Sequence, residues 1–249
     1  MSRGQQLTLI GSWKAEVDYM ASLILSVPVE SGESMRILEA GCGRKWPFNF
    51  SAVPHHLTGV DLDAMALQIR AQTLGDLHEA IVGDLCTVDL GENKFHVIYC
   101  SFVLEHIPEA RKALENLIRS TRQGGVIIVK VPDPVSVQGF VTRWTPHWFH
   151  VLYYRHILRN PNAGKPGHGP YPTHYTPVIS RPGIRQFCDN SEGRVAMEME
   201  LGDGYSSPGK GLRGKLIWLA KSTFWMLSLG RLSRTHTDLL FVMRKANGN

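Results

Sequence analysis

Five stretches of the chain are continuously apolar, which is the pattern of strands that are covered on both faces. They cover residues 35–41, 57–63, 79–85, 95–102 and 124–132. Helical stretches lie between them at about 64–73 and 108–121. Because strands and helices alternate, the pattern predicts an α/β fold with a doubly wound, mostly parallel sheet and right-handed crossovers.

Further elements are predicted near the two ends of the chain. Ser12 can cap a helix that runs to about Leu25, since apolar residues recur there at helical spacing. A short helix from Ser180 precedes two more strands, at 194–201 and 238–245. These strands bring the sheet to seven, within a single domain that spans residues 1–249.

Two segments depart from the alternation of strands and helices. Residues 133–178 are rich in Pro, Gly, His and aromatic side chains, and a segment of this length is usually functional or disordered. Its large rings favour order, so we predict a substrate cap inserted after the fifth strand. A second insertion, at 211–230, is predicted to be an apolar helix, and its apolar run from 216 to 229 is too short to span a bilayer.

Composition places the chain among ordinary soluble globular proteins, with 43% apolar and 20% charged residues in 249. Its four cysteines lie far apart without a C-x-x-C pair, so neither a zinc site nor a disulfide framework is expected. The first twenty residues lack the apolar core of a signal peptide. A reducing cytoplasm is therefore the expected compartment.

The net charge of +5 comes from the last quarter of the chain. Residues 1–180 hold 16 basic and 16 acidic side chains, whereas residues 181–249 hold 11 and 6. This excess is consistent with a surface near anionic lipid or an acidic partner, or with a solvated basic face. The apolar run could dock on the sheet, line the substrate pocket, or contact a membrane peripherally through 212–234. No basic stripe carries interleaved stacking aromatics, so nucleic-acid binding is not expected.

The stretch "EAGCG" (39–43) places two glycines directly after the first predicted strand. A strand that turns sharply at Gly41 and Gly43 exposes backbone N–H groups, and the missing Cβ atoms let a ligand approach the main chain. Structural turns use glycine about as often as binding turns do, so the two glycines alone are a weak signal.

Acidic residues at the ends of three successive strands strengthen this interpretation. Glu39, Asp61 and Asp84 all fall at the carboxyl edge of the predicted sheet, where ligands of open α/β sheets bind. Asp61 is placed to accept both hydroxyls of a ribose, and Asp84 to accept from an adenine amine while the backbone of Leu85 contacts a ring nitrogen. Because Glu39 would repel a pyrophosphate and attract an ammonium or sulfonium, the expected ligand is cationic.

These residues resemble the class I S-adenosylmethionine-dependent methyltransferases over about residues 36–132. The matching stretches are "ILEAGCG", "GVDLD", "VGDL", "CSFVLEHIP" and "RQGGVIIVKVP". The resemblance implies S-adenosylmethionine as cofactor, with Glu39 holding its ammonium through water and Ser101 bordering the sulfonium. It also implies that Gly41 and Gly43 line the methionine portion, and that the two acidic motifs bring Leu62 and Leu85 beside the adenosine.

The sequence departs from the family's pattern in two places. Lys45 stands where the family has a third glycine, and about a dozen residues separate Gly43 from the second strand. The usual first helix must therefore be short or absent, and Trp46 is expected to pack on the core, with the cofactor pocket as the alternative. Phe102 replaces a glutamate that helps to hold a metal in ubiquinone-pathway members, so no metal site is expected.

His106 is the first candidate for a catalytic base. It follows the fourth strand, where a neutral imidazole could take a proton from a substrate hydroxyl. The alternative is a structural histidine bonded to a carbonyl. His147 and His150 lie three residues apart in the cap and are the next candidates, as bases or metal ligands.

The predicted function is methyl transfer from S-adenosylmethionine to a small, partly apolar metabolite, by in-line displacement and most readily to oxygen. Carbon and nitrogen acceptors are the alternatives within methyl transfer. A nicotinamide-dependent oxidoreductase, which Glu39 disfavours, and a non-catalytic binding module are the alternatives from other classes. The sequence does not indicate the oligomeric state.

Overall fold

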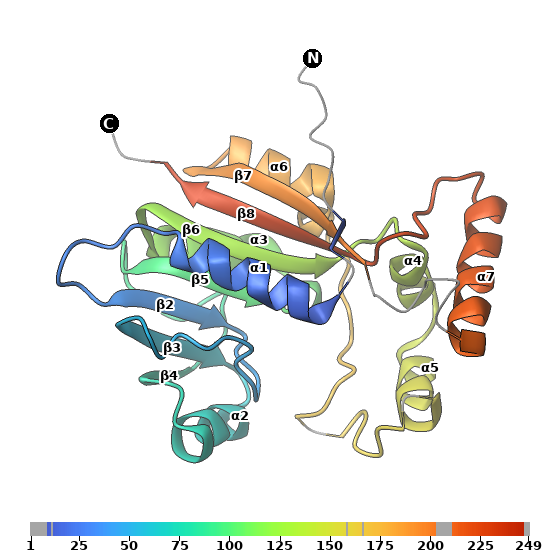
Figure 1. The fold of residues 1–249 in the computed structure, drawn as a ribbon, viewed down its shortest axis with the longest axis horizontal. Coiled ribbons are helices and arrows are strands. Elements are labelled where there is room, and N and C mark those ends of the chain that lie inside the picture. The colour runs from blue at the N-terminus through green and yellow to red at the C-terminus, as the bar shows by residue number, and fades with distance from the viewer. Residues whose placement is uncertain (1–8, 11, 158, 166, 203–210, 247–249) are drawn as a thin grey trace.

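The computed structural model describes residues 9–10, 12–157, 159–165, 167–202 and 211–246. Residues 1–8 and 11, which are part of the N-terminal stretch considered for a leader, lie outside the described residues. One sheet forms the centre of the molecule, in the strand order β1-β7-β8-β6-β5-β2-β3-β4 (Figure 1). Its strands are β1 (Leu9–Ile10), β2 (Met35–Ala40), β3 (His55–Asp61), β4 (Glu79–Val82), β5 (Phe95–Ser101), β6 (Thr121–Pro132), β7 (Gly193–Leu201) and β8 (Asp238–Lys245).

The predicted α/β class and mostly parallel sheet are confirmed. All neighbouring strands pair in parallel except β8, which is antiparallel to both β6 and β7. The two-residue β1 adds an edge strand to the seven expected, and two residues are too few to produce a pattern in the sequence.

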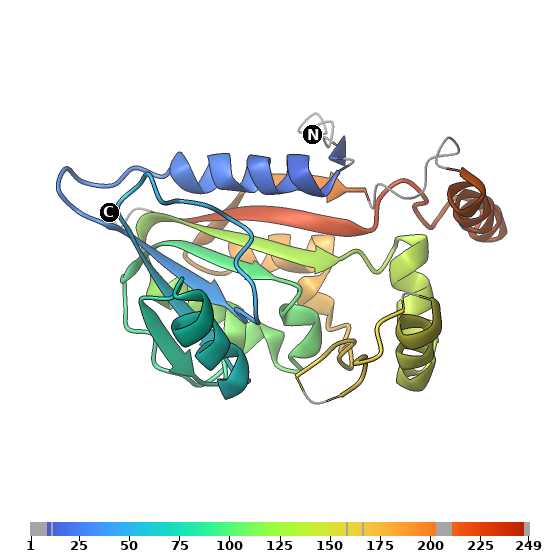
Figure 2. The same ribbon diagram turned by 60° about the horizontal axis from the view of Figure 1, so that its bottom comes forward.

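Helices cover both faces of the sheet (Figure 2). One face carries α1, which begins after Ser12 as predicted, because the Ser12 hydroxyl accepts a hydrogen bond from the Ala15 N–H at 3.2 Å. The other face carries α3 and α6. The helices of this layered core are α1 (Trp13–Leu25), α2 (Ala64–Gln68) with its π-helical extension Ile69–Leu74, α3 (Ala110–Ser120) and α6 (Arg181–Asp189).

The continuous apolar runs arise because adjacent residues of one strand enter opposite core clusters. Ile37 packs in the cluster under α1, and Leu38 packs in the cluster with α3 and α6. Val97 and Ile98 divide in the same way. All four side chains are fully buried, so both faces of the strands are apolar.

No helix joins β2 to β3, as the short connection predicted. Trp46, in this connection, packs edge-on against Phe48 at 4.8 Å and against Tyr99 at 5.9 Å between ring centroids. The expected core packing of Trp46 is confirmed.

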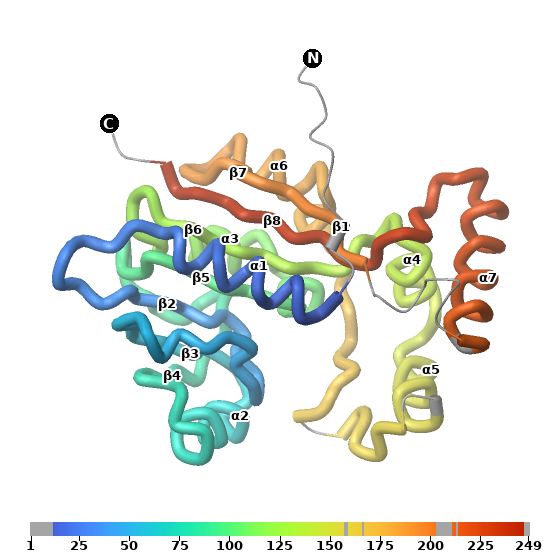
Figure 3. Tube along the Cα trace, viewed as in Figure 1, coloured from blue at the N-terminus to red at the C-terminus, as the bar shows by residue number. Residues whose placement is uncertain are grey.

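The two inserted segments gather beyond the carboxyl end of β6 (Figure 1). The segment between β6 and β7 contains the helices α4 (Val137–Trp144) and α5 (His147–Leu152), a π-helical turn at Tyr153–Ile157 and a short 3₁₀ turn at Pro177–Ile179. The segment between β7 and β8 contains α7 (Gly211–Leu227). After α5 the chain returns to α6 past the carboxyl ends of the strands (Figure 3). The role of residues 133–178 as a substrate cap stays a prediction.

Candidate active site

The turn after β2 is shaped by its two glycines. Gly41 has φ +69°, and a Cβ atom there would lie 2.3 Å from a methyl group of Val103. Gly43 has φ +53°, and its N–H donates to Asp61 Oδ2 at 2.8 Å. No other residue type fits at Gly41 without displacing the segment after β5. The turn therefore brings the ends of β2, β3 and β5 together.

Asp61 lies at the centre of this arrangement. Its second oxygen, Oδ1, accepts from the Asp63 N–H at 2.8 Å. A carboxylate offers about four acceptor positions, so two backbone bonds leave capacity for the hydroxyl groups of a ligand. Asp61 is half-buried at the end of β3, which orients it at the edge where such ligands bind.

Glu39 has a partner that the sequence did not predict. Its Oε2 accepts from Arg70 Nη2 at 2.8 Å, and Arg70, which is fully buried, also bonds the Cys42 carbonyl and the Asp76 carboxylate. Burial raises the pKa of Glu39, and the Arg70 guanidinium opposes that rise. In the sequence Arg70 is a basic residue within the predicted helix 64–73, and a basic residue there usually faces solvent, so the sequence did not indicate its burial.

The residues assigned to the adenosine lie along the neighbouring strand ends. Asp84, beyond β4, is exposed, and its Oδ1 accepts from the Cys86 N–H at 2.8 Å. Leu85 is buried and its carbonyl accepts from Asn116 Nδ2 at 2.9 Å. Leu62 is 73% exposed. The structure places all three at the carboxyl edge, and their role in binding stays a prediction.

Ser101 ends β5 beside Lys130 of β6. Lys130 is buried, forms an ion pair with Glu16 of α1, and lies 4.5 Å from the centre of the Phe102 ring. Phe102 has φ +56°, an uncommon conformation for a bulky residue, and its N–H donates to the Lys130 carbonyl at 2.9 Å. These contacts fix the path of the chain between Ser101 and His106.

His106 is held in one tautomer. Its Nδ1 is 2.8 Å from the Pro172 carbonyl, which accepts only, so this nitrogen carries the proton and Nε2 keeps a lone pair. Burial lowers the pKa of His106, so the ring is neutral at pH 7. Both expectations for His106 are therefore compatible, because bonding to a carbonyl leaves the other nitrogen able to accept a proton.

Next to His106 lies a buried carboxyl group with unused bonding capacity. Glu105 is 2% exposed, its Oε2 has no hydrogen-bond partner, and burial raises its pKa to about 8. The backbone bond from His174 N–H to the Glu105 carbonyl brings the segment from 174 to 176 alongside. In this segment the Tyr175 hydroxyl is buried and lies near enough to Glu105 for the two groups to interact electrostatically. Unpaired buried polar atoms are rare, so the free Glu105 oxygen indicates a place for a polar ligand group.

His147 and His150 lie together, with ring centroids 6.3 Å apart. His150 Nε2 is 2.6 Å from Thr145 Oγ1, and burial lowers the pKa of His150. Within the described residues, no hydrogen bond or ring contact joins either histidine to His106. Figure 1 shows α5 set apart from the ends of β2 and β5. The structure thus brings His106, but not these two, next to the glycine turn.

Part of the predicted cap contacts the mouth of this site. Arg44 and Asp63 form an ion pair at 3.2 Å, and a Cβ atom at Gly167 would lie 2.3 Å from Arg44 Nη2. The Tyr171 ring packs edge-on against His106 at 5.7 Å. Burial raises the pKa of Tyr171, and the nearby carboxylates of Asp63 and Asp61 raise it further. The loop therefore lies over the space between Asp61 and His106.

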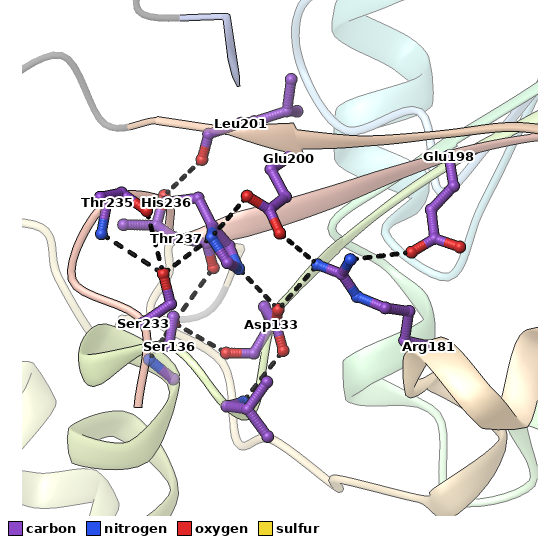
Figure 4. A network of polar contacts seen from close by, with 12 residues as sticks. Asp133, Ser136, Arg181, Glu198, Glu200, Leu201, Ser233, Thr235, His236 and Thr237 are labelled. Carbon is purple, nitrogen blue, oxygen red and sulfur yellow. Dashed lines mark hydrogen bonds and ion pairs between the residues drawn. The ribbon is translucent and has the colours of Figure 1, made fainter. Parts of the chain in front are cut away.

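A polar network at the ends of β6, β7 and β8 anchors both insertions (Figure 4). His236 Nε2 is 2.7 Å from Asp133 Oδ2, and its Nδ1 is 3.2 Å from Glu200 Oε2. Arg181 reaches Glu200 at 2.9 Å and Asp133 at 3.5 Å. Burial would raise the pKa of Asp133, but hydrogen bonds and the Arg181 charge lower it overall. Since Asp133 begins one insertion and His236 ends the other, the network fixes both relative to the sheet.

Within the described part of the chain, no group of three or more His, Cys, Asp and Glu side chains is arranged to hold a metal ion. The four cysteines are free thiols. A concavity of about 690 Å³ contains His55, His56 and His78. It lies at the amino ends of the strands, opposite the edge that carries Asp61 and His106.

The strand order, the antiparallel β8 and the glycine turn bonded to an acidic strand end define a class I methyltransferase architecture. Comparison with known proteins agrees: residues 38–129 match the family model described as a methyltransferase domain. Residues 38–129 are thus similar to the class I S-adenosylmethionine-dependent methyltransferases, and the chain has the fold of that family. One relative is the demethylmenaquinone methyltransferase of Paenarthrobacter aurescens (strain TC1), 28% identical over 139 residues. The match takes in 54% of this chain and 49% of that protein, so the chain spans about half the length of the curated relatives it matches.

Solved structures share the fold over nearly the whole chain. A phosphoethanolamine N-methyltransferase of Haemonchus contortus, in complex with S-adenosylmethionine, has a TM-score of 0.58 and 14% identity, covering 95% of this chain and 53% of that one. The [4+2]-cyclase SpnF has a TM-score of 0.53 and 14% identity, covering 95% and 84%. At this identity the likeness shows the fold alone, and the cyclase illustrates that this fold does not fix the reaction.

Proposed function

We propose that the protein binds S-adenosylmethionine at the carboxyl edge of its sheet and transfers the methyl group to a small, largely apolar acceptor, at oxygen. The observation that carries the proposal is the bond between the Gly43 N–H and Asp61 Oδ2, which assembles the turn and the acidic strand end into one site. The match of residues 38–129 to the methyltransferase-domain model supports this ligand over a nicotinamide dinucleotide.

The residues at this edge fit the cofactor. A Cβ atom at Gly43 would meet nothing within 4 Å, so there is open space on the turn for a ligand to approach the backbone. Asp61 keeps acceptor capacity for ribose hydroxyls, and Asp84 is exposed for an adenine amine. Since Arg70 compensates Glu39, we assign the attraction for a cationic ligand mainly to Asp61 and Asp84.

The chemistry depends on Glu105 and His106, in the segment that follows β5. When bound, the cofactor supplies a methyl group on a positively charged sulfur, which leaves as a neutral thioether when the acceptor oxygen forms its bond to carbon. His106 Nε2 accepts the proton that the acceptor hydroxyl loses, while the Pro172 carbonyl holds the Nδ1 proton. Glu105 Oε1 lies 4.0 Å from Nε2, beyond hydrogen-bond distance, which leaves the lone pair of this nitrogen for the acceptor hydroxyl.

Glu105 also suggests how the acceptor is oriented. With a pKa of about 8, its carboxyl group is largely protonated at pH 7 and can donate a hydrogen bond to an oxygen of the acceptor. The hydroxyl group of Tyr175, which lies near Glu105, offers a further polar contact. The loop with Tyr171 covers the site and limits the access of water, which favours transfer to the acceptor over hydrolysis.

The names of the relatives support an apolar ring compound as acceptor, because they give demethylmenaquinone, a quinone, as the compound that is methylated. A quinone in its reduced form presents hydroxyl groups to His106. It also presents ring carbons, so carbon is the second candidate for the accepting atom.

The proposal is tested by following a labelled methyl group. The protein is incubated with S-adenosylmethionine labelled in the methyl group and with an organic extract of the expression host or a reduced naphthoquinone. Label should move into the solvent-soluble fraction, and His106→Ala should slow the transfer without changing cofactor affinity. NMR of the product then distinguishes an O-methyl from a C-methyl group. Cofactor binding without transfer to any acceptor would favour the non-catalytic binding module.

A further inference from the structure

Large apolar side chains are exposed mainly on two stretches, residues 134–178 and 211–237, which together we call the apolar cationic lobe. The lobe excludes the acidic residues at its borders, Asp133, which is buried, and Asp238, which is half-buried. Among the described residues, 24 large apolar side chains are more than about a third exposed, and 17 of them belong to this lobe. Figures 1 and 2 show its helices together at one end of the molecule, away from β2, β3 and β4. This exposure is concentrated rather than scattered, which distinguishes a contact surface from ordinary surface hydrophobics.

Helix α7 exposes its apolar side chains and buries polar and small ones, which is the reverse of the usual arrangement on a protein surface. Its buried positions are Gly214, Lys221 and Ser222, whereas Leu216, Leu219 and Leu227 are 58%, 58% and 76% exposed. Its main packing partner is α4, through a ring contact between Phe140 and Phe224 at 6.4 Å. The helix thus turns polar and small residues inward and leaves its apolar sides uncovered. Lys221 was expected to lie near lipid headgroups, but its side chain is buried.

The charge of the lobe indicates what covers it. Residues 134–178 and 211–237 contain nine Lys and Arg residues and no Asp or Glu, whereas the rest of the chain holds 18 basic and 22 acidic residues. Lys215 and Arg231 are exposed near the two ends of α7. A second copy of the lobe would bring two such cationic surfaces together and is therefore disfavoured. An apolar surface edged by cations matches the boundary between acyl chains and anionic headgroups.

We propose that the apolar cationic lobe is a membrane-binding surface that lies on anionic lipid headgroups. Within the part of the chain that the structure describes, no helix is long and apolar enough to cross a bilayer, so contact is at the surface. Trp218 and Trp225 of α7 are partly exposed and suit the interface between headgroups and acyl chains. The proposal stands apart from the proposed function, although a membrane surface is where an apolar acceptor would be met.

Vesicle binding tests the proposal on the full chain. Sedimentation with vesicles of phosphatidylcholine alone is compared with vesicles that contain about 30% phosphatidylglycerol, an anionic lipid. The bound fraction should rise roughly tenfold with the anionic lipid and fall as salt is added. Four of the six tryptophans lie in the lobe, so brominated phosphatidylglycerol should quench the intrinsic fluorescence of the unmodified protein.

Two sets of substitutions locate the surface. The triple change Leu216→Gln, Leu219→Gln and Leu227→Gln should weaken vesicle binding by about tenfold or more, because it removes exposed apolar contacts. The double change Lys215→Gln and Arg231→Gln should reduce the preference for anionic lipid. Both should leave the affinity for S-adenosylmethionine unchanged, which also shows that the variants are folded.

Matched controls use exposed residues outside the lobe. Leu25→Gln with Leu74→Gln, and Arg36→Gln with Arg194→Gln, should leave vesicle binding unchanged. Three results would overturn the proposal. They are vesicle binding that ignores the anionic lipid, equal loss in the control variants, or a stable dimer in solution that the leucine substitutions disrupt while vesicles are not bound.

Discussion

Asp61 is the residue on which cofactor binding depends most in this structure. Each hydrogen bond to a charged group is worth about 1.5–3 kcal/mol, so losing two to a ribose predicts a drop of roughly a hundredfold or more in affinity for Asp61→Ala. Asp61→Asn keeps an oxygen for the Gly43 N–H and should lose less. Calorimetric titration of both variants with S-adenosylmethionine measures the effect, and unchanged affinity in the alanine variant would refute the ribose assignment.

Glu105 predicts a pH dependence of stability. Its folded-state pKa of about 8 lies above its ordinary value of 4.5, so the folded protein keeps a proton that the unfolded chain releases. The stability that this proton contributes is fully present below about pH 4.5. The free energy of unfolding then falls as the pH rises toward 8, by up to about 1.4 kcal/mol per pH unit. Glu105→Gln cannot ionise and should escape this loss.

The measurement is urea unfolding of the wild type and Glu105→Gln at pH 5 and pH 8. From pH 5 to pH 8, the free energy of unfolding of Glu105→Gln should rise relative to that of the wild type by up to about 4 kcal/mol. Glu115→Gln, an exposed change on α3, serves as control. If the difference in free energy of unfolding between the wild type and Glu105→Gln stays constant with pH, Glu105 is already ionised in the folded protein.

At the residue scale, the sequence identified groups whose position follows from strand ends, and it missed partners that arise only from folding. Asp61 and Asp84 come to one edge because parallel strands end there. Arg70 and the unpaired Glu105 oxygen could not be foreseen, since burial of a charged side chain depends on which distant residues surround it. The same holds for the bond from His106 to Pro172, which are 66 residues apart.

At the scale of elements, α1 is joined to the sheet by a buried ion pair. Lys130 of β6 and Glu16 of α1 are both less than a tenth exposed. Removing one partner leaves the other charge buried, so Glu16→Ala should lower the free energy of unfolding by about 3–5 kcal/mol. The pair Glu16→Leu with Lys130→Met should recover much of that loss, because it buries no charge.

Chemical denaturation of Glu16→Leu, of Lys130→Met and of the variant that carries both changes checks this prediction. Lys14→Ala, whose pair with Asp18 is exposed, is the matched control and should leave the free energy of unfolding nearly unchanged. A double variant as unstable as the sum of the single ones would contradict the account.

The helices and strands of the sheet were predictable because both follow a regular period of apolar residues. The inserted segments were not, beyond their existence. In α4 and α5, aromatic and basic residues interrupt the period, and α5 buries none of its side chains. The helix α7 was expected from its composition, but its inverted orientation was not, since an apolar run does not indicate which side is covered.

At the scale of the whole molecule, three features meet at the carboxyl edge. The glycine turn and acidic strand ends are at one side, Glu105 and His106 follow β5, and the network around Asp133 fixes the insertions beside them. Charge is also separated: the apolar cationic lobe is basic, and the rest of the chain has more acidic than basic residues. The arrangement separates cofactor binding from the proposed membrane contact, so each can be tested without the other.

The most direct test is calorimetric titration of the full chain with S-adenosylmethionine and, separately, with NAD⁺. The account predicts saturable binding of S-adenosylmethionine to one site per chain and no binding of NAD⁺, because the acidic strand ends favour a cationic ligand over a pyrophosphate. Binding of NAD⁺ in the absence of any binding of S-adenosylmethionine would contradict it.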